Sequence, residues 1–380
     1  MAVKGFMRVS LIASILLGSC VEPFEIPVRN DEVSFLVVDG YINTQTHTAT
    51  VTLSRAIPLS EETAFPRESG ALVSIEGEDG KVYNLMTQGD GMYELANTAF
   101  ENNKRFRLQV KTSNGKEYLS DVITTRAAPP IGSIGWTAES DGLSIKISSE
   151  DLSNSTRYYR WEYSETWRYE SHFGSEFKFE NGKPVTRTAS EQLKTCYRTE
   201  NSEQILIGTT MGLANDKFVD QPVVFVPAAS PKTKFEYSAL VKQFALSKEA
   251  YEYWEQLRTN TESLGGLFDP QPGELRGNIK NTDDPTEPVI GFFDGGAVSE
   301  KRVFIKFEEL PPHLRVYGPP QACIENFVEV DKVSEVTGSN MLTYGVYQGP
   351  TLIGYMYTSN ECADCTLFGG TTIKPDFWLF

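Results

Sequence analysis

Residues 34–54 decide the fold and read SFLVVDGYINTQTHTATVTLS. The first part, Ser34–Ile42, is rich in β-branched and aromatic residues, and Thr48–Ser54 alternates between apolar and polar residues. Alternation with a period of two places apolar side chains on one face of a strand and polar ones on the other. The stretch therefore predicts two β-strands and no helix.

The same pattern continues toward residue 120, with glycine-containing turns between short runs. Further strands are predicted at Ala71–Ile75, Val82–Leu85, Met92–Leu95, Arg105–Val110 and Lys116–Ser120. About seven short strands with closely spaced turns are typical of a β-sandwich. We therefore predict a mostly β protein, with an immunoglobulin-like or transthyretin-like sandwich over residues 34–126.

Ala127–Gly132 contains two prolines and reads as a linker into a larger β-rich domain over residues 127–380. Leu143–Ile147 alternates strictly, and further strands are predicted at Val289–Phe293 and Arg302–Phe307. One main helix is predicted near residues 247–264, because Ser247 suits an N-cap and an apolar stripe follows at a spacing of three to four.

An aromatic stripe runs through residues 157–169, RYYRWEYSETWRY. In a strand, one face would carry Tyr159, Trp161, Tyr163, Trp167 and Tyr169, and the other Arg160, Glu162, Ser164, Thr166 and Arg168. The aromatic face is interpreted first as the core of the second domain. The alternative is a stacking platform for a sugar or peptide, with Trp161, Trp167 and Tyr169 as ligand contacts.

The N-terminus has the pattern of a secretory signal that ends in a lipidation site. Lys4 and Arg8 precede the short apolar run Leu11–Leu17, which is followed by Gly18-Ser19 and Cys20. We interpret residues 1–19 as a signal peptide and Leu17-Gly18-Ser19-Cys20 as a bacterial lipobox, against the alternative of an ordinary signal peptide with a chance cysteine. Residues 20–33 would then form a lipidated tether, and acyl chains on Cys20 would anchor the protein to a bilayer.

The other four cysteines, Cys196, Cys323, Cys362 and Cys365, are even in number, and a compartment outside the inner membrane permits disulfides. The structural interpretation is two disulfides, preferably with Cys196 and Cys323 each joined to one cysteine of the C-x-x-C. A redox motif or a metal site remains the alternative.

Composition excludes several functional classes. The net charge is −16, and −18 once Lys4 and Arg8 leave with the signal peptide, so a nucleic acid partner is not expected. No metal site is predicted from the three scattered histidines, and no cofactor or catalytic motif is recognised. Asn281–Pro285 is interpreted as a solvated turn, with calcium binding as the alternative.

Several segments together resemble a known family. They are the lipobox, Leu36–Ile42, Val51–Arg55, Ala250–Trp254, Leu267–Pro272, Gly277–Ile279, Cys362–Cys365, Gly369-Gly370 and Lys374–Trp378. The chain resembles the Bacteroidota outer-membrane lipoprotein family called domain of unknown function 4249. The resemblance implies an outer-membrane lipoprotein, often encoded beside a TonB-dependent transporter, and it supplies no catalytic residues.

The expected function is therefore a surface-exposed outer-membrane lipoprotein that captures a ligand for, or otherwise assists, a TonB-dependent transporter. One alternative is a secreted, envelope-anchored hydrolase that uses carboxylates, for which Glu249 and Glu252 or Glu308 and Glu309 are weak candidates. Another is a purely structural or adhesive envelope protein.

Overall fold

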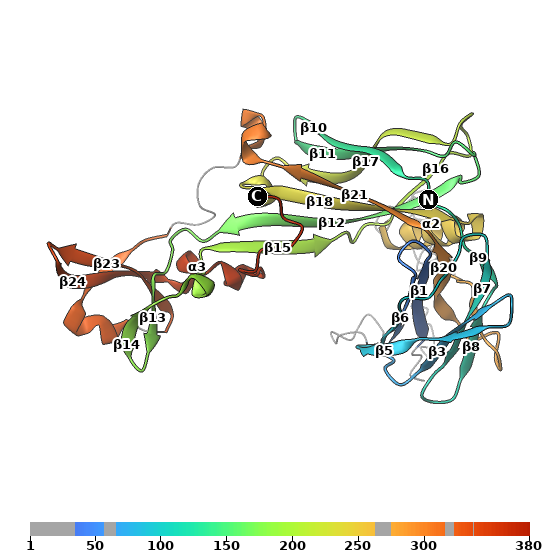
Figure 1. Ribbon diagram of the computed structural model, residues 1–380, viewed down its shortest axis with the longest axis horizontal. Coiled ribbons are helices and arrows are strands. Elements are labelled where there is room, and N and C mark those ends of the chain that lie inside the picture. Colours follow the sequence, from blue (N-terminus) through green and yellow to red (C-terminus); the bar gives the residue numbers. More distant parts are fainter. Residues whose placement is uncertain (1–34, 57–65, 263–274, 316–322, 337) are drawn as a thin grey trace, which may run out of the picture.

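The computed structural model describes residues 35–56, 66–262, 275–315, 323–336 and 338–380. The predicted signal peptide and the whole of the predicted tether, including Cys20, lie outside these residues. The protein is mostly β, with several sheets and few helices, as the sequence predicts. Figure 1 shows an elongated hook: a first sandwich hangs from one end of a long body, and a smaller distal module lies at the other end.

The first sandwich consists of two β-sheets. One has the strand order β20-β1-β2-β6-β5, and the other has the order β19-β8-β7-β3-β4, with β9 paired with β7. Its strands are β1 (Leu36–Asn43), β2 (Thr48–Arg55), β3 (Leu72–Gly77), β4 (Val82–Asn84), β5 (Met86–Gly89), β6 (Met92–Leu95), β7 (Arg105–Lys111), β8 (Glu117–Ser120), β9 (Ile123–Thr124), β19 (Ile279–Asn281) and β20 (Val289–Gly296). The predicted alternation is present, because Val38 and Val51 point into the core while Asp39 points outward.

Two strands of this sandwich come from far along the chain, so the boundaries 34–126 and 127–380 do not match the structure. β20 pairs in parallel with β1, and β19 pairs with β8. A Cβ on Gly291, whose φ is +125°, would lie 1.8 Å from the Val38 carbonyl oxygen, so the close approach of these strands requires glycine. The Asn278 side chain then fixes β20 through two 2.8 Å hydrogen bonds with the Phe293 backbone.

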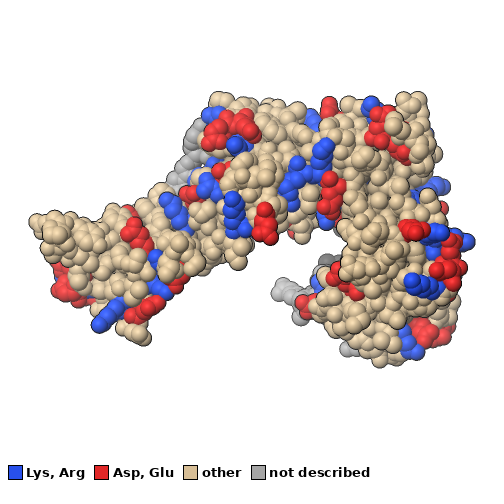
Figure 2. All heavy atoms as spheres, viewed as in Figure 1, with Lys and Arg blue, Asp and Glu red and all other residues tan. Residues whose placement is uncertain are grey.

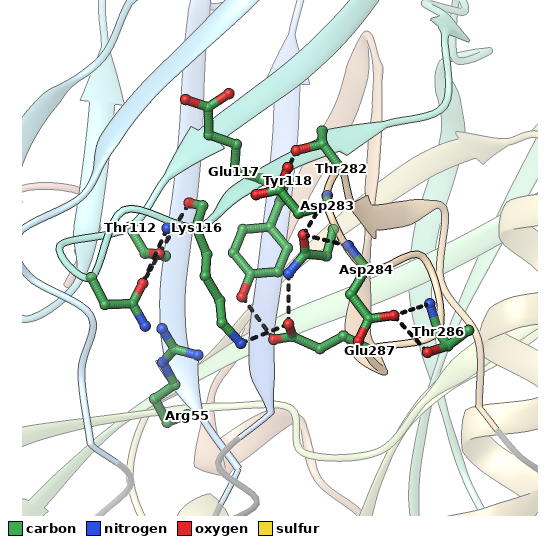
Figure 3. Close-up of polar contacts among 12 residues, drawn as sticks. Arg55, Thr112, Lys116, Glu117, Tyr118, Thr282, Asp283, Asp284, Thr286 and Glu287 are labelled. Carbon is green, nitrogen blue, oxygen red and sulfur yellow. Dashed lines mark hydrogen bonds and ion pairs between the residues drawn. The ribbon is translucent and has the colours of Figure 1, made fainter.

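The loop between β19 and β20 is held to the β7–β8 hairpin by Glu287 (Figure 3). Its carboxylate accepts hydrogen bonds from Lys116 Nζ at 2.7 Å, Tyr118 Oη at 2.9 Å and Asn281 Nδ2 at 2.6 Å. Within the loop, Asn281 Oδ1 accepts the backbone N–H groups of Asp283 and Asp284. Residues 281–285 therefore form a hydrogen-bonded turn, which agrees with the turn predicted from the sequence.

The body is a second sandwich, with the sheets β10-β11-β17 and β15-β12-β18-β21 and with β16 beside β12. Its strands are β10 (Ile131–Ala138), β11 (Gly142–Glu150), β12 (Tyr158–Glu170), β15 (Thr195–Asn201), β16 (Leu206–Thr209), β17 (Lys217–Pro227), β18 (Tyr237–Leu246) and β21 (Val298–Ile305). Short 3₁₀ turns are η1 (Ala189–Glu191), η2 (Pro231–Thr233), η3 (Phe307–Glu309) and η4 (Pro312–Leu314). Ile145, Trp161 and Val241 lie in its core.

Helix α2 (Lys248–Glu262) lies where the first sandwich joins the body (Figure 1). Ser247 caps it, because Ser247 Oγ accepts the Ala250 backbone N–H at 3.0 Å. Its apolar stripe packs into a small third core, where Tyr253 meets Phe292 of β20 at a ring-centroid distance of 5.3 Å. The predicted helix is thus confirmed over the described residues, and it joins two sandwiches instead of covering one.

The distal module contains the hairpin of β13 (Phe177–Glu180) and β14 (Lys183–Thr186) and the sheet β22-β24-β23. That sheet is formed by β22 (Asn326–Glu329), β23 (Asn340–Gln348) and β24 (Thr351–Ser359), with η5 (Val330–Glu335), α3 (Asn360–Ala363) and η6 (Cys365–Phe368) beside it. Two disulfides fasten the module, Cys196–Cys365 and Cys323–Cys362. The preferred pairing scheme is therefore present.

Candidate functional site

A groove of about 560 Å³ lies between the first sandwich and the body, and we call it the junction groove. Its walls come from β1, β12, β18, α2 and the segment 201–206, elements that meet at the inner corner of the hook in Figure 1. Figure 2 shows the hollow that the two sandwiches leave between them. Small-molecule sites favour such interfaces between domains, and this volume lies within their usual range.

Arg160 of β12 is the most constrained charged residue of the junction groove. Its guanidinium lies 4.5 Å from the ring centre of Phe244 and 4.3 Å from that of Trp254, and its Nη1 pairs with Glu162 at 2.6 Å. These contacts from β18, α2 and β12 hold the cation in one position. A fixed guanidinium beside an aromatic wall is a preorganised partner for a polar ligand.

Asp39 of β1 also lines the groove, close enough to Arg160 for the two charges to interact. Its side chain is open to solvent on one side, yet desolvation by the surrounding protein raises the pKa of the carboxyl above its ordinary value of 3.8. Among the described residues it has no hydrogen-bond partner. The groove is lined by three carboxylates, those of Asp39, Glu162 and Glu203. It also contains two cations, Arg160 and Lys242 of β18, and Lys242 pairs with Glu300 at 3.4 Å.

The first sandwich contains a buried polar pair, Tyr41 of β1 and Asp294 of β20, which are opposite each other in register. Asp294 is 5% exposed, and its Oδ1 accepts the Gly295 N–H at 2.9 Å and lies 3.7 Å from Arg126 Nη1. Its Oδ2 and the Tyr41 hydroxyl have no hydrogen-bond partner in the described part of the chain. Desolvation raises the pKa of Asp294 to about 6, against the opposing charge of Arg126.

Of the predicted aromatic ligand contacts, Trp161 contributes to the lining of the junction groove, whereas Trp167 and Tyr169 do not. Trp161 is 2% exposed and Trp167 is 6% exposed, because both rings lie in the core of the body, as the first interpretation states. Tyr169 is half-buried, and its hydroxyl donates to the Cys365 carbonyl oxygen at 2.6 Å. The low exposure of both tryptophan rings favours the core interpretation over the stacking-platform alternative.

Trp161 and Tyr163 of the aromatic face contribute to the groove, and Arg160, Glu162 and Ser164 contribute to it from the polar face of the same strand. Sequence reasoning identified this face but assigned it no role, because an alternating charged face is ordinarily solvated. A second signal was Asp39, the one charged residue in the apolar run 35–42. What brings Asp39 to Arg160 is the packing of two sandwiches, which no local pattern records.

The remaining predicted site residues lie elsewhere. The four cysteines form the two disulfides of the distal module. Glu249, Glu252, Glu308 and Glu309 are all exposed, and none of them lines the junction groove. Within the described ranges, no three His, Cys, Asp or Glu side chains are placed to hold a metal ion, and no helix is both long enough and apolar enough to cross a bilayer.

The fold and the groove define an elongated, disulfide-fastened β protein with a polar cleft between two sandwiches. The chain belongs to the family described as Domain of unknown function (DUF4249), which matches residues 21–302. This membership confirms the resemblance noted in the sequence. No curated protein matches the chain.

Two solved structures match part of this chain at low similarity. The FN1–FN3 domains of chicken CNTN1 are 14% identical with a TM-score of 0.20, and the match covers 56% of this chain and 62% of that one, less than two thirds of its length. A two-domain fibronectin type III segment from chicken tenascin is 9% identical with a TM-score of 0.16, and the match covers 55% of this chain and 90% of that one. At these TM-scores neither structure says anything about the function of this chain.

Proposed function

We propose that this protein is an outer-membrane lipoprotein, facing the cell exterior, that captures a polar ligand for a TonB-dependent transporter. The lipobox at Cys20 supports the anchor, and the family resemblance supports the transporter as partner. The observation that carries ligand capture is the junction groove, a cavity of about 560 Å³ that is lined by both Asp39 and the fixed guanidinium of Arg160.

The chemistry of the groove favours a small ligand that carries both charges or many hydrogen-bonding groups. Asp39 offers an acceptor, Arg160 and Lys242 offer donors, and Trp254 offers an apolar wall. A ligand that satisfies these groups together gains specificity, because each one left unpaired in the cleft costs free energy. The tether between Cys20 and Phe35 can extend at most about 50 Å, so the anchor keeps the first sandwich close to the bilayer.

The transporter partnership is tested by purifying the full-length, tagged protein from detergent-solubilised membranes of its own cells. The expected result is a stoichiometric complex with one TonB-dependent transporter, identified by mass spectrometry. Recovery of a lone monomer would count against the proposal.

Ligand capture is tested on the same preparation by mass spectrometry of small molecules released on denaturation. Ser164→Trp places a bulky ring in the junction groove without changing its charge, and it should abolish the released ligand. Ser140→Trp is the matched control, because Ser140 is exposed on a turn of the body away from the groove. Equal ligand recovery from both variants would refute capture in this groove.

A further inference from the structure

The hairpin of β23 and β24, residues Asn340–Ser359, projects at the end of the distal module farthest from the first sandwich (Figure 1). We call it the tyrosine hairpin. Residues 338–360 contain no charged side chain, whereas 23 residues with the average charge content of this chain would hold about five. Three large side chains are nevertheless exposed on it: Tyr344 is 44% exposed, Tyr347 59% and Ile353 39%.

The tyrosine hairpin is held firmly at its base and on one face. The Cys323–Cys362 disulfide and the hydrogen bond from Thr358 Oγ1 to the Ile324 carbonyl oxygen fasten the end of β24. Tyr355 packs edge-on against Phe177 of β13, with ring centres 5.1 Å apart. A rigid arm loses little conformational entropy when it binds, which favours recognition by the side chains it displays.

Two irregularities in the β23–β24 register, at Leu342/Gly345 and Val346/Tyr347, flank the exposed tyrosines. Bulges blunt a strand edge against pairing with another strand and redirect nearby side chains. The exposed tyrosines therefore favour recognition through side chains and not through strand addition. Tyrosines of this kind are enriched at the energetic centres of protein interfaces.

We propose that the tyrosine hairpin is the surface by which this protein docks onto a partner protein, in an apolar patch rimmed by Lys and Arg. The Lys and Arg on the partner are inferred from the negative charge of the distal module. Residues 171–194 and 323–380 together contain ten Asp and Glu but only six Lys and Arg. A cationic rim complements this excess, whereas a second copy of the same module meets it with like charge. A bilayer fits poorly, because membrane-surface segments carry Lys and Arg and this hairpin carries none.

The inference rests on the proposed function only in naming the partner as the transporter. The test uses the full-length lipoprotein in its own cells, with the photocrosslinking residue p-benzoylphenylalanine at position 347 and, as a control, at position 152. Leu152 is 86% exposed on the body, so it is equally accessible. In parallel, the double variant Tyr344→Ser with Tyr347→Ser is compared with Leu152→Ser for the amount of transporter that co-purifies.

We expect position 347, and not position 152, to crosslink to the transporter at a site that contains Lys or Arg, and the double variant to lose at least tenfold of the co-purified transporter with an unchanged melting temperature. A transporter that co-purifies equally with all variants would overturn the docking surface and leave the proposed function standing. A position-347 crosslink to a different protein with such a site would support the docking surface and remove the transporter role. A crosslink to lipid, to a second copy or to nothing would overturn the docking surface.

Discussion

Replacing Asp294 with asparagine should stabilise the protein at neutral pH. The free-energy cost of burying the charged carboxylate exceeds what its hydrogen bonds and the nearby Arg126 return. Raising its pKa from 3.8 to about 6 corresponds to ~3 kcal/mol of destabilisation once it is charged, since each tenfold change in proton affinity is about 1.4 kcal/mol. Asparagine keeps an oxygen for the Gly295 N–H and is neutral at every pH. The attraction of Arg126, whose Nη1 lies 3.7 Å from Asp294 Oδ1, is already contained in this net shift and is not subtracted a second time.

The expectation for Asp294→Asn is a gain of up to ~3 kcal/mol in the free energy of unfolding at pH 8. The sign follows from proton binding: between pH 4 and 6 the folded protein holds a proton on Asp294 that the unfolded chain has released. The contribution of Asp294 to stability is therefore full below pH 4 and is lost as pH rises through 6. The gain from asparagine should accordingly be small at pH 4.5 and reach its maximum above pH 7.

Urea unfolding of both proteins at pH 4.5, 6 and 8, followed by tryptophan fluorescence, measures this difference directly. Subtracting the parent's free energy of unfolding from that of the variant at each pH cancels the contributions of other carboxyl groups that titrate in the same range. Asp121→Asn is the control, because Asp121 is exposed in the same sandwich and should change stability by less than ~0.5 kcal/mol at any pH. A gain that is equal at all three pH values, or a loss at pH 8, would refute the burial argument.

Three further predictions address the anchor and the fasteners of the fold. Replacing Cys20 with alanine should move the protein from the membrane fraction to the soluble fraction, and an unchanged fraction on cell fractionation would contradict lipidation. Cys365→Ser should lower the free energy of unfolding by ~2–5 kcal/mol in oxidised protein, because the Cys196–Cys365 disulfide closes a loop of 169 residues. If the variant is destabilised by the same amount relative to the parent after both proteins are fully reduced, the disulfide does not explain the effect. Glu287→Gln should cost ~1–3 kcal/mol at pH 7. Desolvation raises the pKa of Glu287, but hydrogen bonds from Lys116, Tyr118 and Asn281 outweigh desolvation and lower it. The cost of Glu287→Gln should therefore shrink as the pH falls below 4.5. A cost that chemical denaturation finds to be independent of pH would contradict this prediction.

Local patterns in the sequence specify the individual elements well. The alternation at residues 36–42 and 48–54 matches β1 and β2, because the period of a strand is set by neighbouring residues alone. The Ser247 cap of α2 follows for the same reason, since an N-cap satisfies backbone groups within one turn. The buried tryptophans of β12 are equally a local consequence of one apolar face.

The tertiary structure decided which distant segments meet. β20 joins β1 across some 250 residues, and this parallel pairing leaves no periodic trace in the sequence of either strand. The same packing brings Asp39 close to Arg160 and buries Asp294. A side chain's accessibility and electrostatic surroundings depend on every element packed around it, so the groove and its charges emerge only when both sandwiches are assembled.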